Sequence, residues 1–100
     1  MYLGSPRVAA LYLVRPVYRD HVAEIDHEAG TPVWQQLADI LRAQIEHGDI
    51  APGKLLPSIR TLMQTYGVSD GTVKRAIADL RSAGLVKSVT GRGTYVAEQK

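Results

Sequence analysis

The stretch YGVSDGTVKRAIADLRSAGLV, residues 66–86, decides the fold of this chain. Gly67 is suited to the left-handed conformation that ends a helix, and the Ser69 hydroxyl is suited to cap the amides that begin the next one. Apolar residues then recur at helical spacing on one side, namely Val73, Ala76, Ile77, Leu80 and Ala83. The sequence therefore predicts two helices joined by a tight turn, the second of which buries one face.

The other side of that second helix carries Gly71, Lys74, Arg75 and Ala78. A solvated basic face on a short amphipathic helix is the default interpretation of such a pattern. The alternative is a surface that binds DNA, and the neighbouring segments decide between the two.

Another helix is predicted near residues 32–47. Thr31 offers a capping hydroxyl, Pro32 suits the first helical position, and Gly48 is suited to end the helix. Trp34 is the only tryptophan, and we expect it to anchor this helix on the core.

Ser58 is expected to cap a second helix that ends at Gly67. Because only residues 67–69 separate this helix from the next, the two form a helix-turn-helix, the unit that places its second helix in the major groove. Before it, Pro52-Gly53 predicts a turn, and Leu55 and Leu56 are expected to form a brief edge strand.

A β-hairpin is predicted over residues 85–97, after the last helix. Its turn places Arg92 between Gly91 and Gly93, so that a cation projects from a tight tip. A cation there is within reach of a phosphate or of the minor groove beside a helix-filled major groove.

Composition narrows the class of protein. The 100 residues make one domain at most, contain no cysteine and include no apolar run that could span a bilayer, so disulfides and membrane insertion are not expected and the cytoplasm is the simplest compartment. The net charge of +2 is unevenly distributed. Residues 58–96 carry six basic and two acidic side chains, a net +4, whereas residues 1–30 carry three basic and four acidic ones, a net −1.

Residues 1–30 show no clear period, although residues 8–14 could form a strand and residues 20–28 a short acidic helix or loop. His21, Glu24 and His27 would share one side of a helix, but their spacing does not match the zinc-binding pattern of two histidines four residues apart. We therefore predict no metal site and no cofactor. Residues 1–30 are interpreted as an arm or a dimerisation element, residues 31–97 as the globular domain and residues 98–100 as a tail.

Three helices followed by a two-stranded hairpin are a mainly α fold with the order of a winged helix-turn-helix. Here the sequence resembles the GntR family of bacterial transcription regulators, and the resemblance covers residues 32–97. It is carried by motifs in one order: Pro32-Val33-Trp34-Gln35-Gln36, Gly48-Asp49-Ile50, Pro52-Gly53, Leu56-Pro57-Ser58 with Arg60, Tyr66-Gly67-Val68-Ser69, Thr72-Val73, Gly84-Leu85-Val86 and Gly91-Arg92-Gly93-Thr94-Tyr95-Val96.

The resemblance implies a dimer that binds operator DNA, usually as a repressor. It places the DNA contacts on the second helix, the recognition helix and the wing, at Arg60, Ser69, Asp70, Gly71, Thr72, Lys74, Gly91 and Arg92. Charge and position add Arg75, which either contacts DNA or pairs with Asp79 four residues on.

The sequence departs from the family pattern at the tip of the recognition helix. Family members often carry arginine and threonine where this chain has Asp70 and Gly71. Asp70 either accepts a hydrogen bond from cytosine N4 or stabilises the helix N-terminus, and the second interpretation needs no partner. Ile59 and Thr61 replace acidic residues common in the second helix, so its capping box is expected to be lost.

GntR regulators usually continue into a larger effector-binding domain, and no effector pocket is readable in this sequence. The chain is either a fragment or a small protein that binds DNA without sensing a metabolite. We expect a transcription regulator that represses by occupying a palindromic operator in double-stranded DNA as a homodimer. The alternative is a winged-helix module that docks a protein partner. An enzyme is not expected, because no nucleophile, base and orienting group converge in the motifs.

Overall fold

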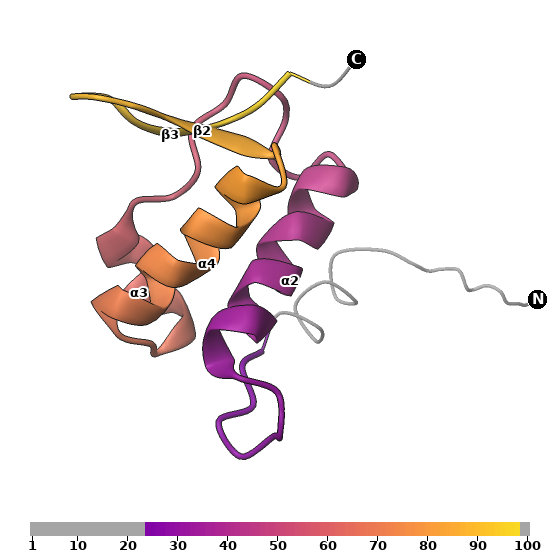
Figure 1. Ribbon diagram of the computed structural model, residues 1–100, viewed down its shortest axis with the longest axis vertical. Helices are drawn as coiled ribbons and strands as arrows, with labels where there is room; N and C mark the ends of the chain where they lie inside the picture. Colours follow the sequence, from indigo (N-terminus) through magenta and orange to yellow (C-terminus); the bar gives the residue numbers. More distant parts are fainter. Residues whose placement is uncertain (1–23, 99–100) are drawn as a thin grey trace, which may run out of the picture.

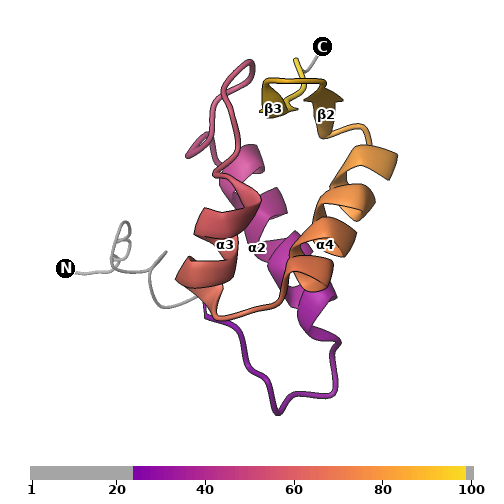
Figure 2. The ribbon, with the colours of Figure 1, turned by 90° about the vertical axis from the view of Figure 1, so that its left-hand side faces the viewer.

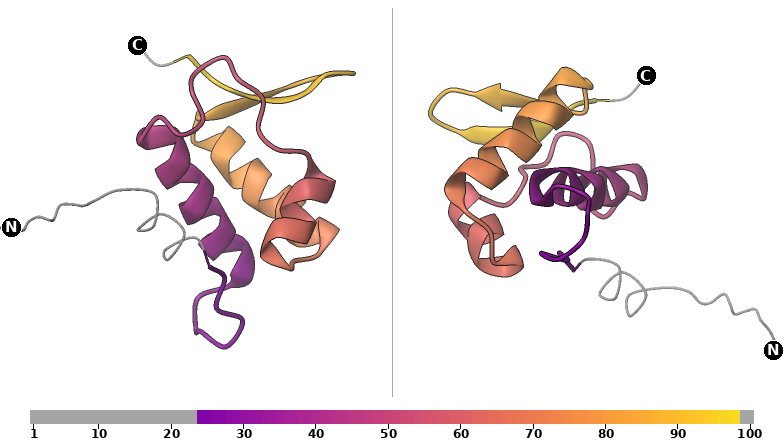
Figure 3. Two further views of the ribbon diagram at one scale, coloured as in Figure 1. Left: turned by 180° about the vertical axis from the view of Figure 1, so that it is seen from behind. Right: turned by 60° about the horizontal axis from the view of Figure 1, so that its bottom comes forward.

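The computed structural model describes residues 24–98. Its elements are α2 (Val33–Glu46), α3 (Ile59–Tyr66), α4 (Asp70–Ser82), β2 (Val86–Val89) and β3 (Gly93–Val96). Figure 1 shows α2 and α4 side by side and running in the same direction, with the hairpin at the C-terminal end of α4. Turned views show α3 against the first half of α4 (Figures 2 and 3). The predicted winged helix-turn-helix fold is confirmed.

The turn between α3 and α4 forms as the sequence predicts. Gly67 takes the left-handed conformation, with φ of 66°, and its N–H bonds to the Met63 carbonyl. The Ser69 hydroxyl accepts the Thr72 N–H at 3.1 Å and donates to the Thr72 hydroxyl at 3.0 Å. This cap satisfies one of the free amides at the start of α4 and fixes where the helix begins.

The start of α3 has the same cap. The Ser58 hydroxyl accepts the Thr61 N–H at 3.1 Å and donates to the Thr61 hydroxyl at 3.0 Å. Thr61 therefore stands where a capping box would have an acidic residue, and the serine half of the box remains. In both caps the hydroxyl hydrogen of the threonine is left for a further acceptor.

The predicted cap of α2 is wrong. Pro32 is extended, with ψ of 145°, and stands at the N-cap position without a side-chain cap bond, so the helix begins at Val33. The Gln36 side chain supports this end instead. Its amide group accepts the Asp26 N–H at 2.8 Å and donates to the Asp26 and Thr31 carbonyls at 2.9 Å each. These bonds tie the residues before α2 to its first turn.

One core joins all five elements. The buried stripe of α4 is confirmed except at Ala83, which is exposed because α4 ends at Ser82 and Ala83 is its C-cap. The buried residues are Leu37, Ala38, Leu41, Ile45, Leu56, Leu62, Val73, Ala76, Ile77, Leu80, Val86 and Val96. Val86 and Val96 place one face of the hairpin in this core, so the wing is fixed relative to α4.

The hairpin pairs β2 with β3 from Val86 opposite Val96 to Val89 opposite Gly93. Its three-residue tip is closed by a bond of 2.9 Å from the Arg92 N–H to the Val89 carbonyl. The predicted edge strand is present only as a single bridge, from Leu55 to Tyr95.

Predictions for the N-terminal segment fall largely on residues 1–23, outside the described residues. Residues 27–31 form turns and bends and residues 24–26 have no regular secondary structure, so no acidic helix is present over residues 24–28. Ile25 packs against the core. The domain boundary at residue 31 and the role of residues 1–30 stay predictions.

Candidate nucleic-acid interface

A groove with basic edges runs between α3, α4 and the hairpin. It consists of two adjoining hollows that share Ile59, Ile77 and Thr94 as lining residues. The described residues that line it include no acidic side chain. We call it the basic groove, and its cations are Arg60, Lys74, Arg81 and Arg92. Apolar side chains in its lining and cations from three segments form a surface that suits a polyanion.

Each cation reaches the basic groove from a position fixed by the fold. Arg60 is the second residue of α3, two positions after the Ser58 cap, and Arg92 projects from the hairpin tip. Both are exposed, and neither forms an ion pair with another described residue. Their charges therefore remain available for phosphates, which arginine binds through paired N–H groups.

Lys74 is already paired. Its Nζ lies 3.0 Å from Asp70 Oδ2, one helical turn earlier, and both side chains are more than half exposed. An exposed pair of this kind contributes only about 0.3–0.5 kcal/mol, so a stronger partner can displace it. The structure thus pairs predicted Asp70, which does not line the groove, with predicted Lys74, which does.

Arg81 belongs to the basic groove, although the sequence analysis did not select it. It is exposed, lines the same hollow as Lys74, and its guanidinium donates to the Ser88 hydroxyl at 2.9 Å. A signal was present, because residues seven apart on a helix share a face and Arg81 follows Lys74 by seven. This hydrogen bond also links the last turn of α4 to β2.

Arg75 does not lie in the basic groove. Its guanidinium lies over the Trp34 ring, 4.4 Å from the ring centroid. The predicted pair of Arg75 with Asp79 is wrong, because Asp79 Oδ2 bonds to Arg42 of α2 at 3.1 Å. Trp34 is half-buried, is not among the residues that pack against the core, and contributes to the contact between α2 and α4 through Arg75.

The remaining predicted residues lie at the N-terminal end of α4 and in the turn of the hairpin. Ser69 and Thr72 are bonded to each other in the cap, which leaves the Thr72 hydroxyl hydrogen as a donor. Gly71 is exposed, and a Cβ there would meet no atom within 4 Å. Gly91 has φ of 79°, which favours glycine and allows the tight turn that presents Arg92.

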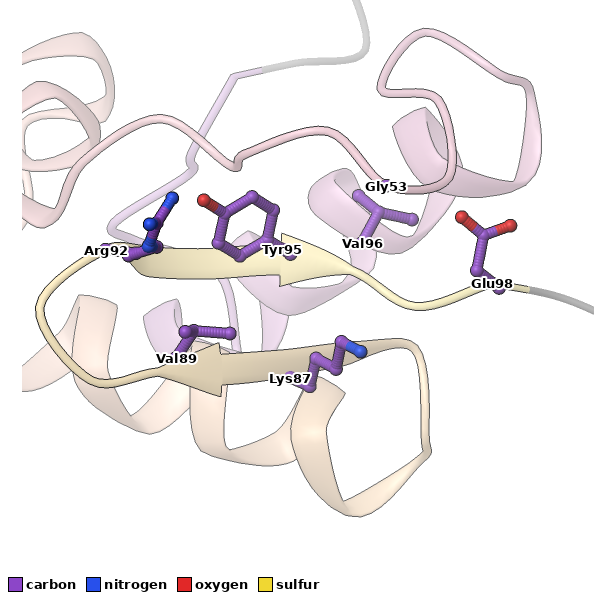
Figure 4. Close-up of a pocket in the computed structure, with 7 residues that line it drawn as sticks. All are labelled: Gly53, Lys87, Val89, Arg92, Tyr95, Val96 and Glu98. Carbon is purple, nitrogen blue, oxygen red and sulfur yellow. The ribbon is translucent and has the colours of Figure 1, made fainter.

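The opposite face of the hairpin forms a separate hollow. Figure 4 shows Lys87, Val89, Arg92, Tyr95 and Glu98 around it. Ser88 faces α4 through its bond to Arg81, so its neighbours Lys87 and Val89 point to the other side of the strand. Arg92, at the tip, borders both this hollow and the basic groove.

The described part of the chain contains neither a metal site nor a membrane-spanning helix. No group of three His, Cys, Asp or Glu side chains within residues 24–98 is placed to hold a metal ion, and His21 of the candidate set lies outside these residues. No helix in the same range is long and apolar enough to cross a membrane.

A winged helix-turn-helix with an exposed, cation-edged recognition helix defines a DNA-binding module. Comparison with known proteins gives the family. The model described as "Bacterial regulatory proteins, gntR family" matches residues 34–96. The chain belongs to the GntR family of bacterial regulatory proteins, which confirms the resemblance seen in the sequence.

Relatives and solved structures agree with this assignment. The chain is 39% identical over 69 residues to the mannosyl-D-glycerate transport/metabolism system repressor MngR of Escherichia coli, which covers 69% of this chain and 29% of that protein. YtrA from Sulfolobus acidocaldarius, a GntR-family transcription factor, has a TM-score of 0.71 and 35% identity and covers 79% of this chain and 83% of that one. The DNA-binding domain of AraR in complex with operator ORX1 has a TM-score of 0.65 and 42% identity, and the match covers 67% of this chain and 81% of that one.

The chain spans only part of its curated relatives. It covers 29% of MngR, 31% of the repressor NagR of Bacillus subtilis and 58% of the repressor YtrA of the same species. The matched region is the helix-turn-helix domain, so the functions of the other parts of those proteins are not transferred to this chain.

Proposed function

We propose that this chain binds a specific operator in double-stranded DNA and represses transcription by occupying it. The observation that carries the proposal is the basic groove, where Arg60, Arg81 and Arg92 meet Lys74 on the exposed side of α4. With α4 in the major groove, cations on either side of it would lie near the phosphates that border the groove.

The named activities of relatives support the proposal. AraR has a similar domain that was solved with operator DNA, and MngR, NagR and the Bacillus subtilis YtrA are repressors. We assign the DNA contacts to Arg60, Ser69, Asp70, Gly71, Thr72, Lys74, Arg75, Gly91 and Arg92, with Arg81 added by the structure. Arg75 would act at the side of α4 nearer α2, because its guanidinium lies against Trp34.

The test is selection of bound sequences from random double-stranded DNA by the purified chain. A two-fold palindrome is expected, with half-sites about one helical turn apart, because two copies related by a two-fold axis each present one α4. Recovery of no sequence above background would contradict the proposal.

Dimerisation is proposed through residues 1–30. Deletion of residues 1–23 keeps Ile25 and the bonds of Asp26 to Gln36, so the fold should persist. We expect the truncated chain to bind a single half-site as a monomer, measured by the mass of the complex with DNA. A truncated chain that still binds the full palindrome as a dimer would place the dimer contact elsewhere.

A protein-docking module is the second candidate function. It is favoured by the Asp70–Lys74 pair, which neutralises the tip of α4 where DNA-binding domains usually carry positive charge. This function predicts DNA binding of generic affinity, with no preference for palindromes, in the same selection experiment.

A further inference from the structure

The ion pair at the tip of α4 is not required to start the helix. The Ser69 hydroxyl already accepts the Thr72 N–H as the cap, so the Asp70 carboxylate is spare. Lys74 Nζ lies 3.0 Å from Asp70 Oδ2, with side-chain exposures of 64% for Lys74 and 54% for Asp70. A carboxylate accepts several hydrogen bonds and an ammonium donates three, so each group can bind a ligand while the two stay paired.

The spacing of this pair matches the edge of one base pair. In a G·C pair, cytosine N4 donates to guanine O6, and such N–H···O bonds join atoms about 2.9–3.0 Å apart. The major groove therefore presents a donor and an acceptor side by side at about the separation of Asp70 Oδ2 and Lys74 Nζ. The carboxylate can accept from cytosine N4 while the ammonium donates to guanine O6 and N7.

We propose that Asp70 and Lys74 act as one unit that recognises a C·G base pair in each operator half-site. This rests on the proposed function, because it requires α4 to enter the major groove. An A·T pair also offers a donor beside an acceptor. Thymine, however, gives the ammonium a single acceptor, O4, next to a methyl group, whereas guanine gives it two acceptors, O6 and N7. Asp70 also disfavours other sequences, because a carboxylate that finds no donor is repelled by the surrounding phosphates.

The expected discrimination is about tenfold in affinity for the C·G pair over A·T at that position, toward the lower end of the range for a good base contact. Asp70→Asn should change the base preference only at the base pair that Asp70 and Lys74 recognise. Asparagine prefers adenine, so the preference should move toward A·T while the other positions of the motif stay as they are. Overall affinity for DNA of random sequence should rise at the same time, because a negative charge leaves the interface.

Asp79→Asn is the matched control. It removes the same charge from the same helix, but Asp79 pairs with Arg42 of α2 rather than with Lys74. The experiment selects bound sequences with the natural chain, Asp70→Asn and Asp79→Asn, then measures affinities for operators changed at the one base pair. Thermal melts of both variants establish that they are folded, and Asp70→Ala serves as a second variant that should show no preference at the position.

Three outcomes separate the possibilities. A preference that moves only in the Asp70 variants supports the proposal. Identical motifs and affinity ratios for the natural chain and the Asp70 variants would overturn it. If the natural chain selects no motif, the proposed function fails and this inference fails with it.

Discussion

The guanidinium of Arg75 in α4 lies over the indole ring of Trp34 in α2, 4.4 Å from the ring centroid. Trp34 is in the first turn of α2 and Arg75 is in the second turn of α4, so the contact joins the two helices at their N-terminal ends. A second link lies further toward the C-terminal ends of the two helices, where Arg42 of α2 forms an ion pair with Asp79 of α4. Both links set the orientation of the recognition helix on its support.

The Trp34–Arg75 contact should contribute measurably to stability. A cation over an aromatic face at a partly exposed site is worth about 0.5–1 kcal/mol. We expect a double-mutant cycle with Trp34→Leu and Arg75→Gln to give a coupling of that size in the free energy of unfolding, measured by urea titration.

The matched control for this cycle pairs Trp34→Leu with Arg81→Gln. Arg81 is an arginine of the same helix that contacts Ser88 instead of the indole ring. Its coupling to Trp34 should be close to zero. Equal couplings in the two cycles would show that the Arg75 effect is a general change in helix charge.

The cations of the basic groove should control how operator binding depends on salt. Lys74→Ala and Arg92→Ala are each expected to weaken binding. Arg92→Ala should also lower the slope of log affinity against log salt concentration by about one, because Arg92 neutralises one phosphate. Arg81→Gln should act in the same way. Lys54→Ala, in an exposed turn outside the groove lining, is the control and should leave the slope unchanged. Unchanged affinity at low salt in both Lys74→Ala and Arg92→Ala would remove the groove from the interface.

The two serine caps should contribute similar free energies to folding. Ser58 and Ser69 each accept a backbone N–H at 3.1 Å, and loss of such a cap costs about 1 kcal/mol. We therefore expect Ser58→Ala and Ser69→Ala to lower the free energy of unfolding by about that amount each. Replacement by threonine, which keeps the hydroxyl, should restore most of it. Equal stability of the alanine and threonine variants would contradict the role of the hydroxyl.

Two glycines of the helix-turn-helix should respond to alanine in opposite directions. Gly67 has φ of 66°, which alanine adopts at a cost of about 1 kcal/mol or more, so Gly67→Ala should destabilise the fold. Gly71 is inside α4 with open space around its Cβ position, so Gly71→Ala should stabilise the fold by a few tenths to about 1 kcal/mol. Thermal melts measure both changes. Weaker operator binding by the more stable Gly71→Ala variant would place DNA close to this position.

Local chemistry made the helix-turn-helix predictable. Gly67 and Ser69 define a helix end and a helix start through bonds within four residues, and the stripe from Val73 to Leu80 follows from the helical period. The predicted cap at Thr31 did not form, because Pro32 rather than Thr31 takes the N-cap position and has no side chain that can cap. Gln36 bonds the Thr31 carbonyl and leaves Pro32 extended.

The sequence by itself determined the order of elements, the face that α4 buries and the placement of a cation at the hairpin tip, because these depend on spacing along the chain. Only the tertiary structure decided which charges meet. It paired Asp79 with Arg42 rather than Arg75, placed Arg75 on Trp34, and brought Arg81 into one groove with Arg60 and Arg92. The physical reason is that helical period fixes a side chain's direction, whereas its partner depends on which neighbouring element packs against that side.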